Sequence, residues 1–195
     1  MPALDRMLLA VVPLLALMPT VGRAQTQVGG MDFYVLIEGT KQGLFANESV
    51  RSSHANRVVG LNFNYLVKVP RDAATGALSG KRQHAPVVLT KEWGAASPQL
   101  FQALFSNEVL KSVVFEFYQT SQTTGAEELA ILVKLTNATV VEIHQYSAGA
   151  ESAASAKHTS SVNTPRLEDV SFMFGGIEIQ HLAGKTMAVD QLGLR

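Results

Sequence analysis

The chain has 195 residues, 16 basic against 16 acidic side chains, and no cysteine. The lack of cysteine excludes disulfides, thiolate metal sites and a cysteine nucleophile, and the zero net charge argues against a broad electrostatic nucleic-acid binder. Only 16% of the residues are charged, against about 25% in an average domain. This shortage of charge suggests that part of the surface is covered by something.

The first thirty residues differ in composition from the rest of the chain. A short polar start is followed by an apolar stretch at 7–21 and by the small residue Ala24. This layout predicts a secretory signal peptide at 1–24, followed by a linker at 25–30. The alternative is a misassigned start, with the true one at Met31. The apolar stretch is shorter than the ~20 residues that a membrane-spanning helix needs, so we expect no stable membrane insertion.

Apolar and polar residues alternate along much of the remaining chain, 31–195. Alternation with a period of two is typical of strands that bury one face. The alternating segments are 33–38, 61–69, 87–93, 112–119, 129–135, 139–143, 170–174 and 177–179. Between the fifth and sixth of them, Asn137 is expected in a hairpin turn. About eight short antiparallel strands in ~160 residues predict a mainly β domain, either a sandwich or a closed barrel.

One segment, 97–107, breaks the alternation. Ser97 is predicted to be the N-cap of a helix, with Pro98 at its first position. The apolar residues that follow recur on one helical face; they are Leu100, Phe101, Leu104 and Phe105. We therefore expect a single helix that packs against the β domain.

Two long connections interrupt the strands, at 70–86 and 147–165. The first is polar, contains Gly76 and Gly80, and carries charges of both signs. The second is rich in Ser and Ala and has no periodicity, which predicts a flexible surface loop. Loops of this length in a compact domain are usually functional or disordered, and the turn signals and charges favour a function for the first.

No motif for catalysis or metal binding stands out. The nucleophile-elbow pattern Gly-x-Ser-x-Gly is absent. The neighbouring carboxylates at 127–128 and 168–169 point to opposite faces of a strand, so neither pair forms an acid/base site by itself. No two of the five histidines are three or four residues apart, the spacing of a local metal pair. We expect the protein not to be an enzyme and to have no cofactor.

An ordered set of segments resembles the haemolysin-coregulated protein (Hcp) family, the tube proteins of bacterial type VI secretion systems. The resemblance covers about 31–190. Its segments begin with Met-Asp-Phe-Tyr-Val-Leu-Ile-Glu-Gly at 31–39 and continue at 60–65, 70–76, 80–84, 90–94, 96–101, 113–118, 135–139 and 167–172. Each segment is short, but their order along the chain is specific.

The resemblance implies a closed β-barrel of two antiparallel sheets with one flanking α-helix. It also implies a structural, secreted protein whose hexameric rings stack into an inner tube and carry effectors in the lumen. The family's long loop between the second and third strands contributes to ring stacking. By motif match that loop is 70–86 here, and its polar contacts are Arg71, Asp72, Lys81, Arg82, Gln83 and His84.

The implied partners are further copies of the chain, the sheath and spike of the secretion system, and effector proteins. A ring needs a head-to-tail interface that closes on itself, and the outward apolar side chains of Leu36, Leu66 and Leu132 are expected between subunits. The implied route is assembly in the cytoplasm followed by secretion, with periplasmic transit if the signal peptide is real. Because the family does not need such a leader, cleavage after Ala24 would favour an alternative, an exported β-barrel binding module outside the tube.

Overall fold

The computed structural model describes residues 33–147 and 166–192. The predicted signal peptide, the linker and most of the Ser/Ala-rich loop lie outside the described residues. Contacts within the chain divide it into two units, 1–30 and 31–195, and the fold below is that of the second unit. Among the described residues, no helix is both long enough and apolar enough to cross a membrane.

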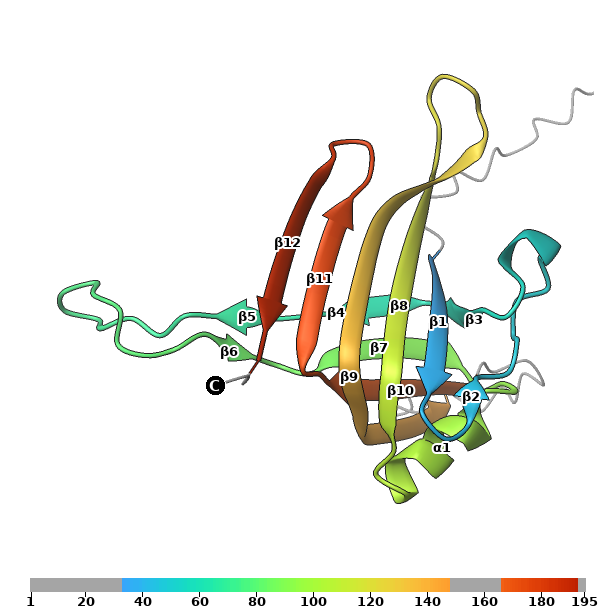
Figure 1. Ribbon diagram of the computed structural model, residues 1–195, viewed down its shortest axis with the longest axis horizontal. Helices are drawn as coiled ribbons and strands as arrows, with labels where there is room; N and C mark the ends of the chain where they lie inside the picture. Colours follow the sequence, from blue (N-terminus) through green and yellow to red (C-terminus); the bar gives the residue numbers. More distant parts are fainter. Residues whose placement is uncertain (1–32, 148–165, 193–195) are drawn as a thin grey trace, which may run out of the picture. The chain divides into compact units, whose positions relative to one another are not determined.

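The described part of this unit is mainly β, as the sequence predicted. Its strands are β1 Phe33–Gly39, β2 Gly43–Leu44, β3 Val58–Gly60, β4 Asn62–Asn64, β5 Val67–Lys68, β6 Gln83–His84, β7 Val87–Glu92, β8 Val109–Thr120, β9 Glu127–Ser147, β10 Arg166–Met173, β11 Gly176–His181 and β12 Thr186–Gln191. A 3-10 turn, η1, spans Ser52–His54, and the helix α1 spans Ser97–Phe105. All of the strand pairs that these residues form are antiparallel (Figure 1).

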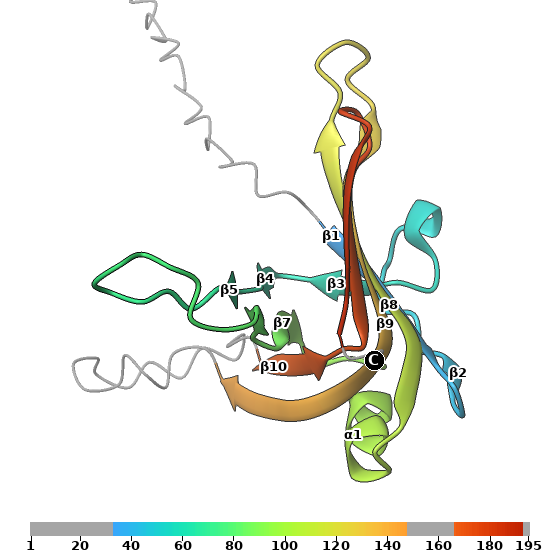
Figure 2. The same ribbon diagram turned by 60° about the vertical axis from the view of Figure 1, so that its left-hand side comes forward.

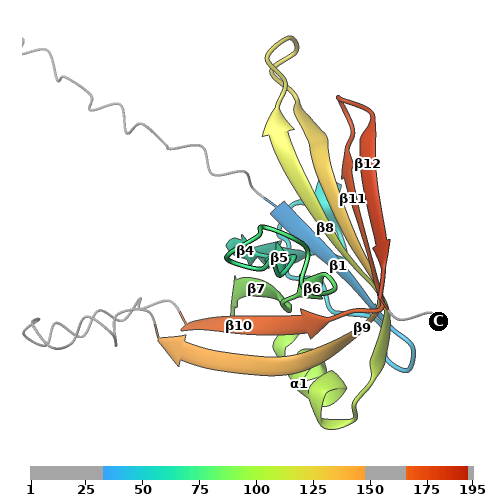
Figure 3. The same ribbon diagram turned by 90° about the vertical axis from the view of Figure 1, so that its left-hand side faces the viewer.

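The long strand β9 belongs to two sheets. Its first part pairs with β8 and β11, and its last part pairs with β10; Figure 3 shows it turning a corner between the two. The hairpin expected at Asn137 is therefore wrong. Asn137 lies inside β9 with a φ of 50°, a left-handed conformation that Asn tolerates better than most residues, and the strand continues through it.

The segment that contains β3 and β4 closes the barrel. Its first half pairs with β1 and its second half with β7, and between them the Leu61 N–H donates to the Thr90 carbonyl at 2.9 Å. The pairings thus lead from β1 through β8, β9, β10 and β7 back to β1. Strands β11 and β12 extend the first sheet beyond β9 (Figure 1), and Figure 2 shows these two strands edge on.

The inward faces of both sheets form one apolar core. Phe115 and Phe172 are fully buried and contact edge to face, with ring centroids 6.4 Å apart. Leu100 and Ala103 of α1 join this core. Burial of these side chains supplies the main driving force for the fold.

The helix is confirmed, but its predicted cap is not. Ser97 is the first helical residue, Ala96 takes the N-cap position without a side-chain hydrogen bond, and Pro98 stands in the first turn. The Ser97 hydroxyl points inward, where it donates to Glu168 Oε1 at 2.7 Å. The Ser97 hydroxyl, which was predicted to cap the helix, therefore binds the buried carboxylate of Glu168 instead.

Candidate functional site

The predicted assembly loop is an exposed two-stranded ribbon. At its base β5 pairs with β6, and further out Arg71 forms a bridge with Leu78. Every residue from 71 to 83 is exposed, and Figure 1 shows the ribbon projecting away from the barrel. Because so little of it packs on its own domain, its side chains are available to another molecule.

A carboxylate shapes the tip of this ribbon. Asp72 Oδ1 accepts hydrogen bonds from the Thr75 N–H and hydroxyl, both at 2.8 Å, and from the Ala74 N–H at 3.1 Å. These bonds, those from Thr75 foremost, hold the pKa of Asp72 below its ordinary value. Gly76 completes the turn with a φ of 69°, which glycine adopts without steric cost. The negative charge of Asp72 is therefore engaged by hydrogen bonds within its own turn.

The base of the ribbon is tied to strand β12. Arg82 donates to Asp190 Oδ1 at 2.8 Å, and His84 Nε2 lies 3.2 Å from Asp190 Oδ2. On its other side, His84 Nδ1 lies 2.7 Å from the hydroxyl of Tyr65. Burial, aided by the charge of Asp190, raises the pKa of Tyr65. Asp190 was not predicted as a partner of the loop, because it lies 108 positions from Arg82 along the chain.

The six predicted contact residues thus have different roles. Arg82 and His84 meet at Asp190, while Arg71 and Asp72 lie at the tip, where Arg71 donates to the Gly76 carbonyl at 3.0 Å. Gln83 pairs with Lys68 in the β5–β6 ladder. Lys81 has no hydrogen-bond or ion-pair partner within the described part of the chain. A hollow of about 770 Å³ beside the ribbon is lined by Val69, Arg71, Leu78, Lys81, Arg82 and Asp190.

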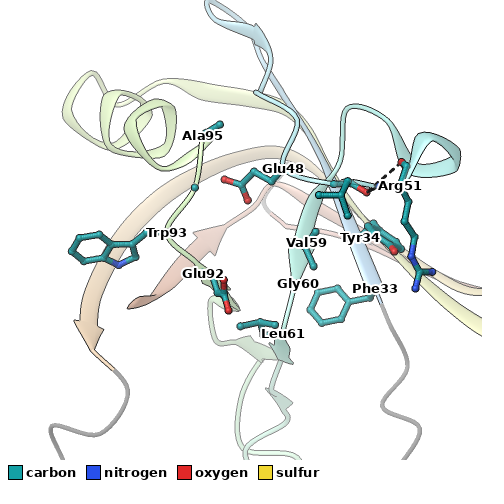
Figure 4. A pocket seen from close by; sticks show the side chains of 13 residues that line it. Phe33, Tyr34, Glu48, Arg51, Val59, Gly60, Leu61, Glu92, Trp93 and Ala95 are labelled. Carbon is teal, nitrogen blue, oxygen red and sulfur yellow. Dashed lines mark hydrogen bonds between the residues drawn. The ribbon is translucent and has the colours of Figure 1, made fainter. Parts of the chain in front are cut away.

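A second hollow, which we call the β3 pocket, was not predicted. It has a volume of about 590 Å³, and Figure 4 shows residues that line it. Its walls come from β1, β3, the segment at 48–51 and the segment that leads into α1; they include Phe33, Glu48, Val50, Leu61, Glu92 and Trp93. The side chains of Leu61 and Trp93 are about half exposed, at 52% and 45%. An exposed Trp beside other apolar groups is a common feature of protein interfaces.

A buried charge cluster supports one wall of the β3 pocket. The Lys91 ammonium lies 3.0 Å from a carboxylate oxygen of Glu48 and 3.0 Å from one of Glu168. Glu48 also accepts a hydrogen bond from the Ala96 N–H at 2.8 Å. These contacts fix the segment at 48–51 against the start of α1, so the pocket is a preformed hollow.

Apolar side chains also lie on the outer face of the sheet formed by β1, β8, the first part of β9, β11 and β12, which we call the larger sheet. Leu36 and Leu132 are half-buried there, whereas Leu66, near the base of the ribbon, is 56% exposed. Leu132 pairs with Gln180, which in turn pairs with Met187 of β12, so Leu132 and Met187 share this face. The edge strand β12 presents Met187 and Val189 to solvent. A partly apolar sheet face and an edge strand such as β12, paired on one side, favour contact with another chain.

The described residues include no group of three or more His, Cys, Asp or Glu side chains placed to hold a metal ion. The features that stand out are instead a charged ribbon, a preformed hollow and a partly apolar sheet face. An antiparallel barrel with these features is suited to contacts with other protein chains.

Residues 34–181 match the family model described as type VI secretion system effector, Hcp. The chain is also 36% identical over 166 residues to the Major exported protein of Pseudomonas aeruginosa, a match that covers 80% of this chain and 92% of the relative. The chain therefore belongs to the Hcp family, as its sequence predicted.

Solved structures agree with this assignment. The secreted protein Hcp3 from Pseudomonas aeruginosa is 31% identical, with a TM-score of 0.65 and coverage of 83% of this chain and 98% of that one. A crystal structure of an Hcp protein gives a TM-score of 0.72 at 24% identity, covering 83% and 99% of the two chains. The second likeness is one of fold. It supports the barrel with one flanking helix.

Proposed function

We propose that this chain, an Hcp protein of a type VI secretion system, is a structural subunit of the inner tube. In this proposal six copies form a ring, the rings stack, and the tube leaves the cell. The observation that carries the proposal is the exposed ribbon at 70–86 on an Hcp barrel. A segment this exposed, with its base tied to the barrel by Asp190, is suited to contact a neighbouring ring.

The ring contacts are proposed on the outer face of the larger sheet. On an isolated subunit Met187 and Val189 are 64% and 54% exposed, and covering them removes apolar surface from water. A closed ring uses one head-to-tail contact repeated around an axis. Subunits with neighbours on all sides need few charged residues, since charge is depleted at interface cores, and this agrees with the 16% charged residues of the chain.

Secretion, cargo and partners are further parts of the proposal. The relative named Major exported protein supports export of this chain with the tube. Sheath and spike proteins are the proposed partners for ejection, and effector proteins are the proposed cargo of the lumen. The role is structural, and no step of it requires catalysis by the chain.

The test is the assembly state of the purified protein. Negative-stain microscopy is expected to show rings and stacks, and a monomer at every concentration would overturn the proposal. The variant Lys81→Glu with Arg82→Glu should weaken stacking while the barrel stays folded, because exposed loop charges contribute little to stability. Lys185→Glu, at an exposed position in the β11–β12 turn, is the control and should stack normally.

A second candidate function is an exported β-barrel binding module that does not enter a tube. The signal-peptide pattern at 1–24 favours it, because a periplasmic protein does not meet a cytoplasmic sheath. N-terminal sequencing of the mature protein separates the two candidates. A start at Gln25 supports the binding module, and a start at Met31 supports the tube subunit.

A further inference from the structure

The β3 pocket combines an apolar floor with surplus negative charge. Leu61 and Trp93 supply half-exposed apolar surface, and Val50 at the rim is 100% exposed. Glu48 and Glu92 both line the hollow (Figure 4), Glu48 with its carboxylate held against Lys91 in the wall. A segment that fills this pocket should therefore present an apolar side chain flanked by cations.

The charges around the pocket do not cancel. Behind its wall the carboxylates of Glu48 and Glu168 face a single ammonium, that of Lys91. Glu92 adds a third carboxylate, exposed and without a hydrogen-bond or ion-pair partner among the described residues. The one cation of the lining, Arg51, forms an ion pair with Glu127 at 3.2 Å. The pocket thus keeps a negative surplus that a cationic partner would neutralise.

The ribbon at 70–86 has the complementary chemistry. Leu78 near its tip is 66% exposed. Lys81 lies three residues further along, and Arg71 faces Leu78 across the ribbon. The only carboxylate of the ribbon, Asp72, is occupied by the hydrogen bonds of its own turn. The ribbon therefore offers an apolar side chain between two cations.

The positions of ribbon and pocket require two copies. The strands β3, β4 and β5 follow one another across the domain in Figure 1, with the pocket at the β3 end and the ribbon continuing beyond β5. The ribbon points away from the pocket of its own chain. A contact between ribbon and pocket therefore joins the ribbon of one copy to the pocket of the next. Such a head-to-tail contact repeats as a stack when it does not close into a ring.

We propose that the β3 pocket receives the 70–86 ribbon of a second copy of this chain, with Leu78 against Leu61 and Trp93, and Lys81 near Glu92. The proposal rests on the proposed tube function and identifies the surface on which the stacking ribbon docks. Charge complementarity of this kind sets the register and selects the partner more than it adds affinity.

Cysteine cross-linking tests the contact directly, since the natural chain has no cysteine. A disulfide forms only where two Cα atoms approach within about 7 Å. Full-length chains carrying Leu78→Cys together with Val50→Cys, or with Leu61→Cys, should give a ladder of oligomers on mild oxidation that collapses on reduction. The control joins Leu78→Cys with Val141→Cys, which is 45% exposed on β9, and should give no ladder.

Each outcome of the cross-linking is decisive. A ladder from either pocket pair, but not from the control, supports the docking contact. If neither pocket pair gives more cross-linked oligomers than the control, the docking contact is overturned. This holds even if the wild-type protein forms stacked rings and so upholds the tube function. Wild-type protein that forms no rings overturns the tube function, whereas the cross-links still report whether two copies dock.

A charge exchange tests the proposed ion pair. Glu92→Lys and Lys81→Glu should each reduce the stacked fraction in sedimentation, and the chain with both changes should recover it because every contact regains opposite charges. Glu142→Lys makes the same change as Glu92→Lys at an exposed carboxylate on β9 and should leave stacking unaltered. A double variant that stacks no better than the single variants overturns the pairing of Lys81 with Glu92.

Discussion

The Lys91 ammonium lies 3.0 Å from the Glu168 carboxylate, and neither side chain is exposed to solvent. The cluster also includes Glu48, the Ser97 hydroxyl and the Gln145 amide, which donates to Glu168 at 2.7 Å. Together these groups join β7, β9, β10, the first turn of α1 and the segment at 48–51. A buried charge is tolerated when every polar atom around it has a partner, so the cluster ties the wall of the β3 pocket to the barrel.

Removing the cation from this cluster should destabilise the fold strongly. Lys91→Met should lower the free energy of unfolding by about 3–5 kcal/mol, because it leaves two carboxylates buried without their cation. Urea unfolding followed by circular dichroism measures the loss. Lys111→Met, which breaks an exposed pair with Glu38, is the control and should cost less than about 1 kcal/mol. Equal losses in both variants would contradict the role assigned to Lys91.

A second buried carboxylate should make stability depend on pH. Burial alone would raise the pKa of Glu108, but hydrogen bonds from the Lys41 N–H and from the side chain and N–H of Gln42 outweigh it and hold the pKa below its ordinary value of 4.5. Folding therefore favours the ionised form. The stabilisation is present above about pH 4.5 and is lost as the pH falls through the lower, folded-state pKa.

Glu108→Gln tests this dependence. The variant should be less stable than wild type at pH 7, and the difference should be smaller at pH 3, because below about pH 4.5 the unfolded chain takes up the proton more readily than the folded one. Urea midpoints at the two pH values provide the measurement. Glu142→Gln, at an exposed site, should leave the pH dependence of wild type intact. A constant difference between Glu108→Gln and wild type would rule out the linkage.

Periodicity predicted most of the longer strands but missed β12, and it could not predict where a strand bends or which polar groups meet. Asn137 is as suitable for a bend within β9 as for a hairpin turn, since both use its left-handed conformation. The Ser97 hydroxyl has two possible acceptors, the helix backbone and a carboxylate 71 residues away. Only the closed barrel brings Glu168 to Ser97 and Asp190 to Arg82. The family's loop was recognisable from local residues, whereas the β3 pocket is assembled from distant segments.

The link between Asp190 and the ribbon should control the motion of the ribbon. Asp190→Asn removes the charge that holds Arg82 and His84, so the amides of β5 and β6 should exchange with deuterium several-fold faster, as expected for a locally less stable element. Global stability should change by less than about 1 kcal/mol, because Arg82 is largely exposed and exposed ion pairs contribute little to stability. Asp169→Asn is the control; Asp169 accepts a hydrogen bond from Thr90 on a different part of the barrel. Unchanged exchange in β5 and β6 would show that the backbone ladder alone holds the base of the ribbon.

The closing segment of the barrel has no room for a side chain at Gly60. A Cβ there would overlap the ring of Phe33, which is buried and stacks on Phe117 with centroids 5.0 Å apart. Gly60→Ala should therefore force either the ring or the β1–β3 pairing to move, at a cost of about 1–3 kcal/mol.

A double-mutant cycle separates steric overlap from a general weakness of the β3 strand. Phe33→Leu should destabilise the barrel by itself through lost packing, but Gly60→Ala should cost less in that background than in wild type, because the overlapping ring atoms are gone. Thermal unfolding of the four proteins gives the coupling. Phe33 and Gly60 also line the β3 pocket. Gly60→Ala should therefore reduce the ladder of disulfide-linked oligomers formed by the chain with Val50→Cys and Leu78→Cys, even where the barrel stays folded. Additive losses together with an unchanged ladder would mean that the barrel closes, and the pocket forms, without this close approach.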